Sequence, residues 1–494
     1  MKKNDFDILI IGGGINGCGV AKELSARGYK VCLVEKQDLA SGTSSWSTKL
    51  IHGGLRYLEN YEFRLVRESL KEREVLMQIA PHLIRPLRFV LPHLAGMRPK
   101  WLLRLGLFFY DNLGGVHLGR KRRLEKSTFV DLKNSAAGKP LKPSFNAGFE
   151  YSDCFVDDSR LTILTALAAA EEGAEIRRDC EVQRLNREAD VWLAHSSTGP
   201  ITAKIVINAG GPWVEQIIAR QASSKNKARI RLVRGSHVIT KRLFEHDKAY
   251  IFQNSDGRIL FALPYLEDFT LIGTTDIDHN TSPDSPQISA EEIDYICSEL
   301  GLYLARPISK ADIVASFSGV RPLVNDGRDA AQSVTRDYVL EWQADTSQSW
   351  LNIFGGKLTT YRKLSIKVAD MVASVLPIAQ AEFNPVEPLP GGAIPESDFG
   401  QFVTRIQNEF PQHPKKMLTR MVAAYGTRIY QILGSHEMPA DLGQNFGFDL
   451  YSAEIDYLVD QEWARTADDI LLRRTKLSLY FDKTMTEQLK SYLE

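Results

Sequence analysis

Cysteine is scarce in this chain of 494 residues. Its five cysteines are odd in number, and no two of them form a C-x-x-C pair. This pattern argues against a disulfide framework and against a cysteine-based zinc site, and it suits a reducing compartment. The sequence therefore predicts no bound metal. The cysteines are Cys18, Cys32, Cys154, Cys180 and Cys297.

The chain also lacks a net charge and a long apolar run. Its 61 Lys and Arg residues balance 61 Asp and Glu residues, so no global charge attracts nucleic acid. It contains no stretch of about 18 or more apolar residues, which a membrane-spanning helix would require. Residues 1–7 contain two lysines and two aspartates, which is unlike a signal peptide. We expect a protein of the cytoplasm that does not bind nucleic acid.

A dinucleotide-binding fingerprint opens the chain. Residues 7–11 (DILII) form a continuous apolar run, typical of a strand buried on both faces of a parallel sheet. The sequence GGGING at residues 12–17 satisfies G-x-G-x-x-G. A helix is expected over residues 20–26 and a second strand over residues 30–34, followed by Glu35. Strand, loop, helix, strand and acid occur in the order that dinucleotide binding requires.

Each position of the fingerprint has a physical role. Gly12 permits a tight turn, Gly14 lets the backbone approach a pyrophosphate, and Gly17 allows close packing of helix on strand. The start of the helix, with Asn16, supplies free N–H groups for the phosphates. Glu35 lies at the distance expected for a carboxylate that binds the ribose hydroxyls. The fingerprint alone does not distinguish NAD from FAD.

Longer motifs recur beyond the fingerprint, over essentially the whole chain. They include TSSWSTK at 43–49, HGGLRYLE at 52–59, FEYSD at 149–153, NAGGPW at 208–213, RGSH at 234–237, IGTTD at 272–276, SGVRPL at 318–323, FGGKLTTYRK at 354–363 and ADDILLRRTK at 467–476. In these motifs the chain resembles the FAD-dependent glycerol-3-phosphate dehydrogenases, and within that family the bacterial aerobic enzymes.

The resemblance implies that the cofactor is FAD, bound without a covalent link. It implies oxidation of sn-glycerol 3-phosphate to dihydroxyacetone phosphate by hydride transfer to the flavin. It also assigns cofactor contacts to the segment after the second strand and to later glycine-bearing turns. These further residues are Thr43, Ser44, Ser45, Lys49, Gly210, Gly356, Leu358 and Thr359.

The implied fold is α/β, with a discontinuous Rossmann-like FAD-binding domain, an antiparallel-sheet domain that caps the substrate side, and a helical C-terminal domain. Short strands separated by turns between residues 229 and 275 indicate the antiparallel sheet. Amphipathic helices are expected over residues 453–460 and 462–479. The assigned segments are 1–75, 155–215 and 335–387 for the FAD-binding domain, 76–154 and 216–334 for the capping domain, and 388–494 for the C-terminal domain.

Arg56 and Arg321 are the arginines that the resemblance places in the substrate pocket. A guanidinium suits a phosphate because two of its N–H groups can bond the phosphate oxygens together. Tyr57 and Thr274 are expected to bond the substrate as hydroxyl partners. The alternative is that both are ordinary surface arginines. Their positions within matched motifs disfavour this alternative.

His237 is our first choice for the acceptor of the substrate's hydroxyl proton, because imidazole titrates near neutral pH. The alternative is that it only packs, as histidines within strands often do. Arg321 or Lys357 could instead stabilise the developing alkoxide. Lys357 follows Gly355 and Gly356 at a strand-to-helix turn, where backbone amides could stabilise the reduced flavin.

The family passes its electrons to a membrane quinone, so the resemblance implies peripheral association with the inner membrane. Residues 98–126 carry eight basic residues against two acidic ones, around the apolar run WLLRLGLFFY at 101–110. This composition suits a segment that lies on anionic lipid. The alternative is a core helix with a solvated basic edge. A homodimer is also left open.

Two other functions remain open from the sequence. An FAD-dependent amine or amino-acid oxidase shares the fingerprint and the capping sheet, but it usually lacks a helical tail beyond residue 388. A non-enzymatic flavoprotein would have no reason to bring Arg56, Arg321, His237 and Lys357 together.

Overall fold

The computed structural model describes residues 5–55, 62–94, 99–114, 124–188, 190–221, 230–254, 256–324, 337–343, 349–377, 384 and 386–494. Arg56 and Tyr57, both assigned to the substrate, lie outside these ranges. Among the described helices, none combines the length and the apolarity needed to cross a bilayer. Over the same residues, no group of His, Cys, Asp and Glu side chains is arranged to hold a metal ion.

The first sheet contains eight strands in the described part of the chain and carries the dinucleotide fingerprint. Its strands are β1 (Phe6–Ile11), β2 (Val31–Val34), β7 (Glu175–Arg177), β8 (Val182–Glu188), β9 (Val191–Ser196), β10 (Gly199–Asn208), β17 (Val339–Gln343) and β18 (Ser349–Phe354). The order is β17-β18-β10-β1-β2-β7, with β9 on β10 and β8 on β9. β1 is parallel to both neighbours and almost entirely buried, as its apolar run predicts.

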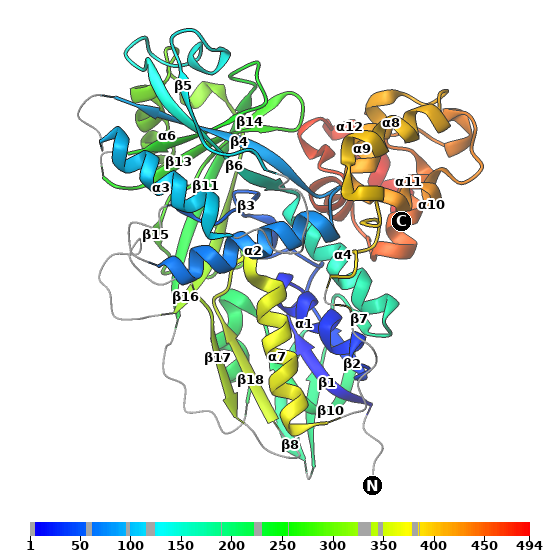
Figure 1. Cartoon of the computed structure of the whole chain (residues 1–494). Helices are drawn as coiled ribbons and strands as arrows, with labels where there is room; N and C mark the ends of the chain where they lie inside the picture. Colours follow the sequence, from blue (N-terminus) through cyan, green and yellow to red (C-terminus); the bar gives the residue numbers. More distant parts are fainter. Residues whose placement is uncertain are drawn as a thin grey trace.

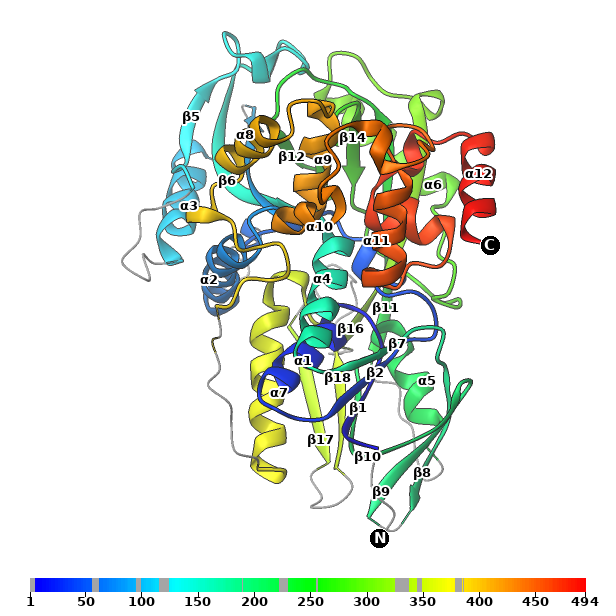
Figure 2. The same ribbon diagram turned by 90° about the vertical axis from the view of Figure 1, so that its right-hand side faces the viewer.

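Helices cover one face of this sheet (Figure 1), and a hairpin with a short helix covers the other (Figure 2). The first face packs against α1 (Ile15–Ala26), α4 (Asp158–Glu171) and α7 (Tyr361–Val375). The second face packs against the β8–β9 hairpin and α5 (Val214–Ala219). α1 begins earlier than the sequence predicted, because the helix starts within the glycine-rich loop itself.

The second sheet contains ten strands in the described residues, and its pairs are antiparallel except for β4 with β12. These strands are β3 (Leu50–Ile51), β4 (Ile84–His93), β5 (Thr128–Asp131), β6 (Ala147–Val156), β11 (Ile230–Lys241), β12 (Ala249–Gln253), β13 (Ile259–Tyr265), β14 (Phe269–Gly273), β15 (Ile277–Asp278) and β16 (Ile313–Val324). The order is β15-β11-β14-β13-β12-β4-β6-β3, with β16 on β11 and β5 on β6. The predicted antiparallel capping sheet is confirmed.

The chain enters the second sheet earlier than the assigned domain boundary at residue 75. β3 pairs with β6 and therefore belongs to the capping sheet. A strand of two residues is too short to show a periodic pattern, so the sequence could not reveal it. Helices α2 (Phe63–Ile79), α3 (Lys100–Leu113) and α6 (Ala290–Tyr303) complete this half of the molecule.

The C-terminal domain is a separate group of helices with its own core (Figure 2). It contains α8 (Phe399–Glu409), α9 (Lys415–Tyr425), α10 (Ile429–Leu433), α11 (Ser452–Glu462) and α12 (Lys483–Leu493). The expected helix over residues 462–479 is wrong. Trp463 and Lys476 both have positive φ, which interrupts a right-handed helix, and only a short π-helical turn at Asp469–Arg474 lies between them.

Candidate active site

A cavity of about 530 Å³ lies where the two sheets meet, and it contains most of the predicted site. Its walls come from the ends of β1, β2 and β10, from the segment after β2, from β12 and β13, and from the turn after β18. The predicted residues on the wall are Gly12, Gly14, Asn16, Glu35, Thr43, Ser44, Gly210, Thr274, Arg321, Gly356, Lys357, Leu358 and Thr359.

The glycines of the fingerprint are required by close backbone packing. Gly12 has φ +117°, and a Cβ there would lie 2.6 Å from the carbonyl oxygen of Ala209. A Cβ on Gly17 would overlap the carbonyl oxygen of Gly12. Gly17 does not line the cavity; it lets α1 start directly against the loop. The free N–H groups at the start of α1 therefore face a space suited to a pyrophosphate.

Glu35 directly follows β2 and lies at the cavity wall. Its Oε2 accepts from the Gly13 amide at 2.7 Å, and its Oε1 accepts from the Gln37 amide at 3.0 Å. Each carboxylate oxygen has further lone pairs, so the side chain can still accept from ribose hydroxyls. Glu35 thus fixes the fingerprint loop and lies where the sequence predicts a ribose contact.

The segment after β2, residues 38–49, is termed the cofactor loop. Seven of its residues line the cavity, but two predicted cofactor residues do not. Ser45 is buried and donates to the Ala40 carbonyl. Lys49 is buried and donates to the Ser45 carbonyl at 3.0 Å and to Asp158 at 2.8 Å. These two side chains hold the loop in shape. The wall residues are Ser41, Gly42, Thr43, Ser44, Trp46, Ser47 and Thr48.

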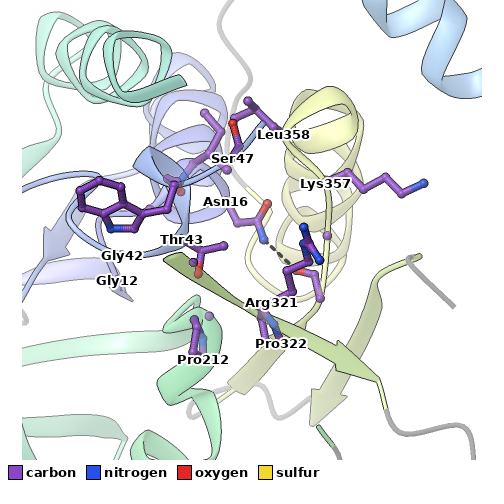
Figure 3. A pocket seen from close by; sticks show the side chains of 18 of the residues that line it. Gly12, Asn16, Gly42, Thr43, Ser47, Pro212, Arg321, Pro322, Lys357 and Leu358 are labelled. Atoms are coloured by element: carbon purple, nitrogen blue, oxygen red, sulfur yellow. Dashed lines mark hydrogen bonds between the residues drawn. The ribbon is translucent and has the colours of Figure 1, made fainter. Parts of the chain in front are cut away.

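The turn after β18 forms the opposite wall (Figure 3). Asn16 Nδ2 donates to the Gly355 carbonyl at 3.1 Å, whereas its Oδ1 is buried with no hydrogen-bond partner in the described structure. Gly355 and Gly356 have φ of +75° and +104°, so their backbone can adopt a tight curve. An orphaned polar atom beside bare backbone fits a bound flavin, whose ring carries polar edges.

Arg321 on β16 lies at the capping-sheet side of the cavity. Its guanidinium donates to Thr274 Oγ1 at 2.7 Å and forms an ion pair with Asp276. A Cβ on Gly235 of the neighbouring strand would lie 2.7 Å from Arg321 Cζ, so this glycine makes room for the arginine. Arg321 and Thr274, both predicted from the sequence, are thus in direct contact.

His237 on β11 lies behind the cavity wall. It is completely buried and stacks on Phe317 with ring centroids 4.8 Å apart. Its Nε2 lies 3.0 Å from Thr48 Oγ1, and Thr48 lines the cavity. Burial, reinforced by the positive charge of Arg321, lowers the pKa of His237 to about 3. Among the described residues, the hydrogen bond of His237 toward the cavity is the one with the Thr48 hydroxyl.

Sequence reasoning missed residues that the fold brings into the wall. His52 lines the cavity, with its ring edge against Phe261 at a centroid distance of 6.3 Å. It is the one histidine among the described wall residues. Thr48 and Asp276 also line the cavity. His52 and Asp276 both lie within motifs on which the family resemblance rests, so these motifs could have pointed to them.

Comparison with known proteins gives matches over the whole chain. The family model for FAD dependent oxidoreductases matches residues 7–362, and the model for the C-terminal domain of alpha-glycerophosphate oxidase matches residues 386–492. D-erythritol 1-phosphate dehydrogenase of Brucella abortus is 44% identical over 480 residues, which cover 96% of this chain and 95% of that protein. Aerobic glycerol-3-phosphate dehydrogenase of Escherichia coli is 40% identical over 494 residues, covering 99% and 97%.

A solved structure extends this agreement to the fold. The glycerol-3-phosphate dehydrogenase from Bacillus halodurans, complexed with FAD, aligns with a TM-score of 0.77 and 26% identity, covering 99% of this chain and 89% of that chain. The alignment spans nearly the whole chain, and in this chain the glycines and the orphaned Asn16 oxygen at the cavity fit the flavin cofactor. The chain therefore belongs to the FAD-dependent glycerol-3-phosphate dehydrogenase family, and its cofactor is FAD.

Proposed function

We propose that the enzyme oxidises sn-glycerol 3-phosphate to dihydroxyacetone phosphate. The observation that carries this proposal is the position of Arg321. Its guanidinium lies on the wall of the same cavity as the FAD fingerprint, with Thr274 beside it. A fork of N–H donors at that place suits a substrate phosphate. Arg56, which the sequence also assigns to the phosphate, lies outside the described residues.

The residues of the cavity supply the remaining requirements of the reaction. Bound FAD accepts the hydride from the carbon that bears the hydroxyl group. We propose that His52, which lines the cavity, accepts the proton of that hydroxyl, so that loss of hydride and proton leaves a carbonyl. Arg321 holds the substrate anion, with Asp276 balancing its charge until substrate enters. Backbone amides at the turn carrying Lys357 are placed to stabilise negative charge on the reduced ring.

A second candidate substrate is D-erythritol 1-phosphate. The relative named for that substrate is 44% identical to this chain, as against 40% for the Escherichia coli enzyme named for glycerol 3-phosphate. Both substrates are phosphates of small polyols, so a phosphate-binding guanidinium serves either. The helical tail, which matches a domain of alpha-glycerophosphate oxidase, favours both over the amine or amino-acid oxidase.

Anaerobic reduction of the bound flavin tests the substrate directly. Purified holoenzyme is mixed with glycerol 3-phosphate, D-erythritol 1-phosphate or glycine, and the flavin absorbance is followed. We expect glycerol 3-phosphate to bleach the flavin with a larger second-order rate constant than D-erythritol 1-phosphate does. Glycine should cause no bleaching. Faster bleaching by D-erythritol 1-phosphate would make that compound the preferred substrate. Bleaching by glycine alone would indicate an amino-acid oxidase instead.

For the electron acceptor, we propose membrane quinone, reached by docking of α3 on anionic lipid. Five large apolar side chains of α3 are exposed, with Trp101 at 68% and Phe108 at 60%. Lys100 and Arg104 lie on the same helix. An apolar face flanked by basic residues is typical of a helix that lies in the membrane interface. The five are Trp101, Leu102, Leu105, Phe108 and Phe109.

Several basic residues that supported this docking in the sequence lie outside the described residues. They are Arg98, Arg120, Lys121, Arg122 and Arg123. The alternative of a core helix fits poorly, because Leu107 and Tyr110 are the buried side chains of α3. We also propose association with the cytoplasmic face of the inner membrane, and a homodimer.

A further inference from the structure

The C-terminal domain sends a short basic segment, residues 473–476, into the FAD-binding half of the molecule. Arg473, Arg474 and Lys476 are each 9% exposed or less. Arg473 and Arg474 contact Asp38 at the start of the cofactor loop, and Lys476 contacts Ser159, next to the Asp158 that binds the end of the loop; these partners lie more than three hundred positions away in sequence. These contacts are not explained by the reaction chemistry, since none of the three residues lines the cavity in the described structure.

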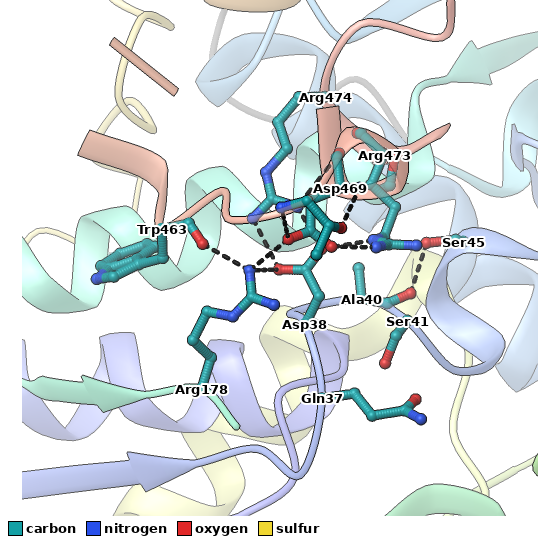
Figure 4. Close-up of polar contacts among 12 residues, drawn as sticks. Gln37, Asp38, Ala40, Ser41, Ser45, Arg178, Trp463, Asp469, Arg473 and Arg474 are labelled. Carbon is teal, nitrogen blue, oxygen red and sulfur yellow. Dashed lines mark hydrogen bonds and ion pairs between the residues drawn. The ribbon is translucent and has the colours of Figure 1, made fainter. Parts of the chain in front are cut away.

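The first anchor lies at the start of the cofactor loop (Figure 4). Asp38 follows Glu35 by three residues and is 3% exposed. Its two oxygens accept from both terminal nitrogens of Arg474, one of them at 2.8 Å, and from Arg473 Nε at 2.5 Å. Arg178 donates to the same carboxylate at 3.2 Å. This end of the loop is thus held by two arginines of the C-terminal domain, together with Arg178 of the FAD-binding domain.

Asp469 completes this anchor from the C-terminal side. It accepts from Arg178 at 2.6 Å and from Arg473 at 2.5 Å, and also from the backbone amides of Arg465 and Thr466. These donors hold the pKa of Asp469 well below its usual range, against the opposing effect of burial. Three arginines therefore share two carboxylates in a buried cluster with little water to screen it, and Arg178 also pairs with Asp179.

The second anchor lies at the end of the cofactor loop. Asp158, at the start of α4, accepts from Lys49 at 2.8 Å and from the hydroxyl of Ser47 at 2.7 Å. Lys476 donates to Ser159 and lies 3.3 Å from Asp157 and 3.9 Å from Asp158. Lys476 thus supports the same short turn that holds the loop residues on either side of Thr48.

The backbone of the cofactor loop needs this support. Ala40 and Lys49, one beside each anchor, have φ of +62° and +60°. Residues with a Cβ rarely adopt this conformation, and they persist in it where the surrounding structure over-determines them. Buried ion pairs contribute little net stability, but they can select one conformation among several. The cluster is therefore better suited to fixing the conformation of the loop than to stabilising the contact between the domains.

We infer that the segment 473–476 is a positioning element of the FAD site: it fixes both ends of the cofactor loop, so that FAD affinity depends on the C-terminal domain. The residues between the anchors form the wall against which the cofactor rests. By linkage, a contact that favours the FAD-binding shape of the loop is itself strengthened when FAD binds.

Equilibrium dialysis of the full-length holoenzyme against a series of FAD concentrations tests the inference. Asp38→Asn removes the loop side of the first anchor and Arg474→Met removes its C-terminal side. We expect each to raise the Kd for FAD at least about tenfold, and the double variant to raise it no further than the larger single effect, because the two act through each other. Additive effects would overturn the coupling.

A matched control separates the anchors from domain docking in general. Arg428 also crosses from the C-terminal domain to α4, donating to Glu171 at 2.6 Å, but it does not contact the cofactor loop. Arg428→Met should leave the Kd for FAD within about twofold of wild type. An equal loss in this variant would mean that docking alone matters and would overturn the proposal.

Two further measurements protect the test against misfolding of the Arg474 variant. Lys476→Met acts on the second anchor alone. It should also raise the Kd for FAD at least about threefold, and an unchanged Kd would count against the inference. In the wild-type protein, amide hydrogen exchange of residues 469–477 should be slower with FAD bound than without it. Identical exchange in the two states would contradict the predicted linkage.

Discussion

Thr48 Oγ1 lies 3.0 Å from His237 Nε2, and this contact joins the cavity wall to a histidine that does not line it. The Nδ1 of the same ring is buried with no hydrogen-bond partner among the described residues. With its pKa lowered to about 3 by burial, His237 is neutral at the pH values at which enzymes are usually assayed. It can orient Thr48 without changing its own charge.

The two histidines should therefore respond differently to substitution. His52→Asn is expected to lower kcat by about 100-fold or more, because it removes the proposed proton acceptor, and to change the pH profile. His237→Asn should lower kcat less and leave the shape of the profile between pH 5 and pH 9 intact. Steady-state kinetics over that range distinguish them, and loss of the acid limb in the His237 variant would restore it as the acceptor.

Arg321→Ala should lower kcat/KM by about 100-fold or more while the protein keeps its FAD. Loss of preorganised donors for the substrate anion typically costs this much, and the guanidinium of Arg321 is held by Thr274 and Asp276 on the capping-sheet side of the cavity. Arg321→Lys should recover only part of the activity, since an ammonium cannot form the fork. The ratio of flavin to protein absorbance checks retention; a variant that loses FAD but binds substrate would refute the role.

Gly17→Ala should prevent FAD binding. Its Cβ would overlap the Gly12 carbonyl oxygen, so the loop or α1 would have to move where the pyrophosphate binds. Gly106→Ala is the matched control, because a Cβ there meets nothing within 4 Å, and alanine favours a helix by up to about 1 kcal/mol. FAD content and thermal unfolding of both variants would be measured. Normal FAD content in Gly17→Ala would show that the helix start can relax.

Membrane docking should depend on the exposed face of α3. Replacing Trp101 and Phe108 together by Glu should reduce co-flotation with vesicles containing anionic lipid, because it places charge on the apolar face. Leu302→Glu is the control, since that side chain is 54% exposed on α6. Flavin reduction by the substrate should be unchanged in both variants. If the double variant floats as well as wild type, α3 is not the docking surface.

Acid should weaken the fold through His82. The ring is completely buried with no hydrogen-bond partner in the described structure, and burial, together with Arg160 and Arg85, lowers its pKa to about 3. In the unfolded chain the pKa is about 6.5, so between these values the unfolded state binds the extra proton. The free energy of unfolding therefore falls as pH falls below 6.5.

By pH 5 the loss from His82 alone amounts to about 2 kcal/mol. His82→Leu lacks the titrating group, so its thermal midpoint should drop less than that of wild type between pH 7 and pH 5. Equal drops in the two proteins would indicate that His82 is not buried as a neutral ring.

The local parts of the fold could be predicted from the sequence. The role of Gly17 is set by a neighbour within the fingerprint, the Gly12 carbonyl oxygen, and the apolar run before Gly12 is enough to predict β1. The interruption of the helix expected over residues 462–479 could not be predicted, because the amphipathic pattern is real but Arg473 and Arg474 turn away to bind Asp38. A contact spanning 436 positions leaves no trace in a local pattern.

Part of the site could also be predicted from the sequence, through its motifs. Arg321 and Thr274 lie in motifs that carried the resemblance, and the structure brings their side chains into contact. The burial of His237 depends on the pairing of β11 with β14 and β16, which sequence periodicity does not reveal. Periodicity likewise could not show that His52 lines the cavity while Lys49, three residues earlier, does not.

The strand order of the first sheet has a consequence for synthesis of the protein. β1 is made first, but its neighbour β10 ends at Asn208 and the next strand, β18, ends at Phe354. A nascent chain on the ribosome therefore carries the fingerprint long before the sheet around it can close. Pairings so distant in sequence form late, so the sheet around the fingerprint can close only after β18 has been made.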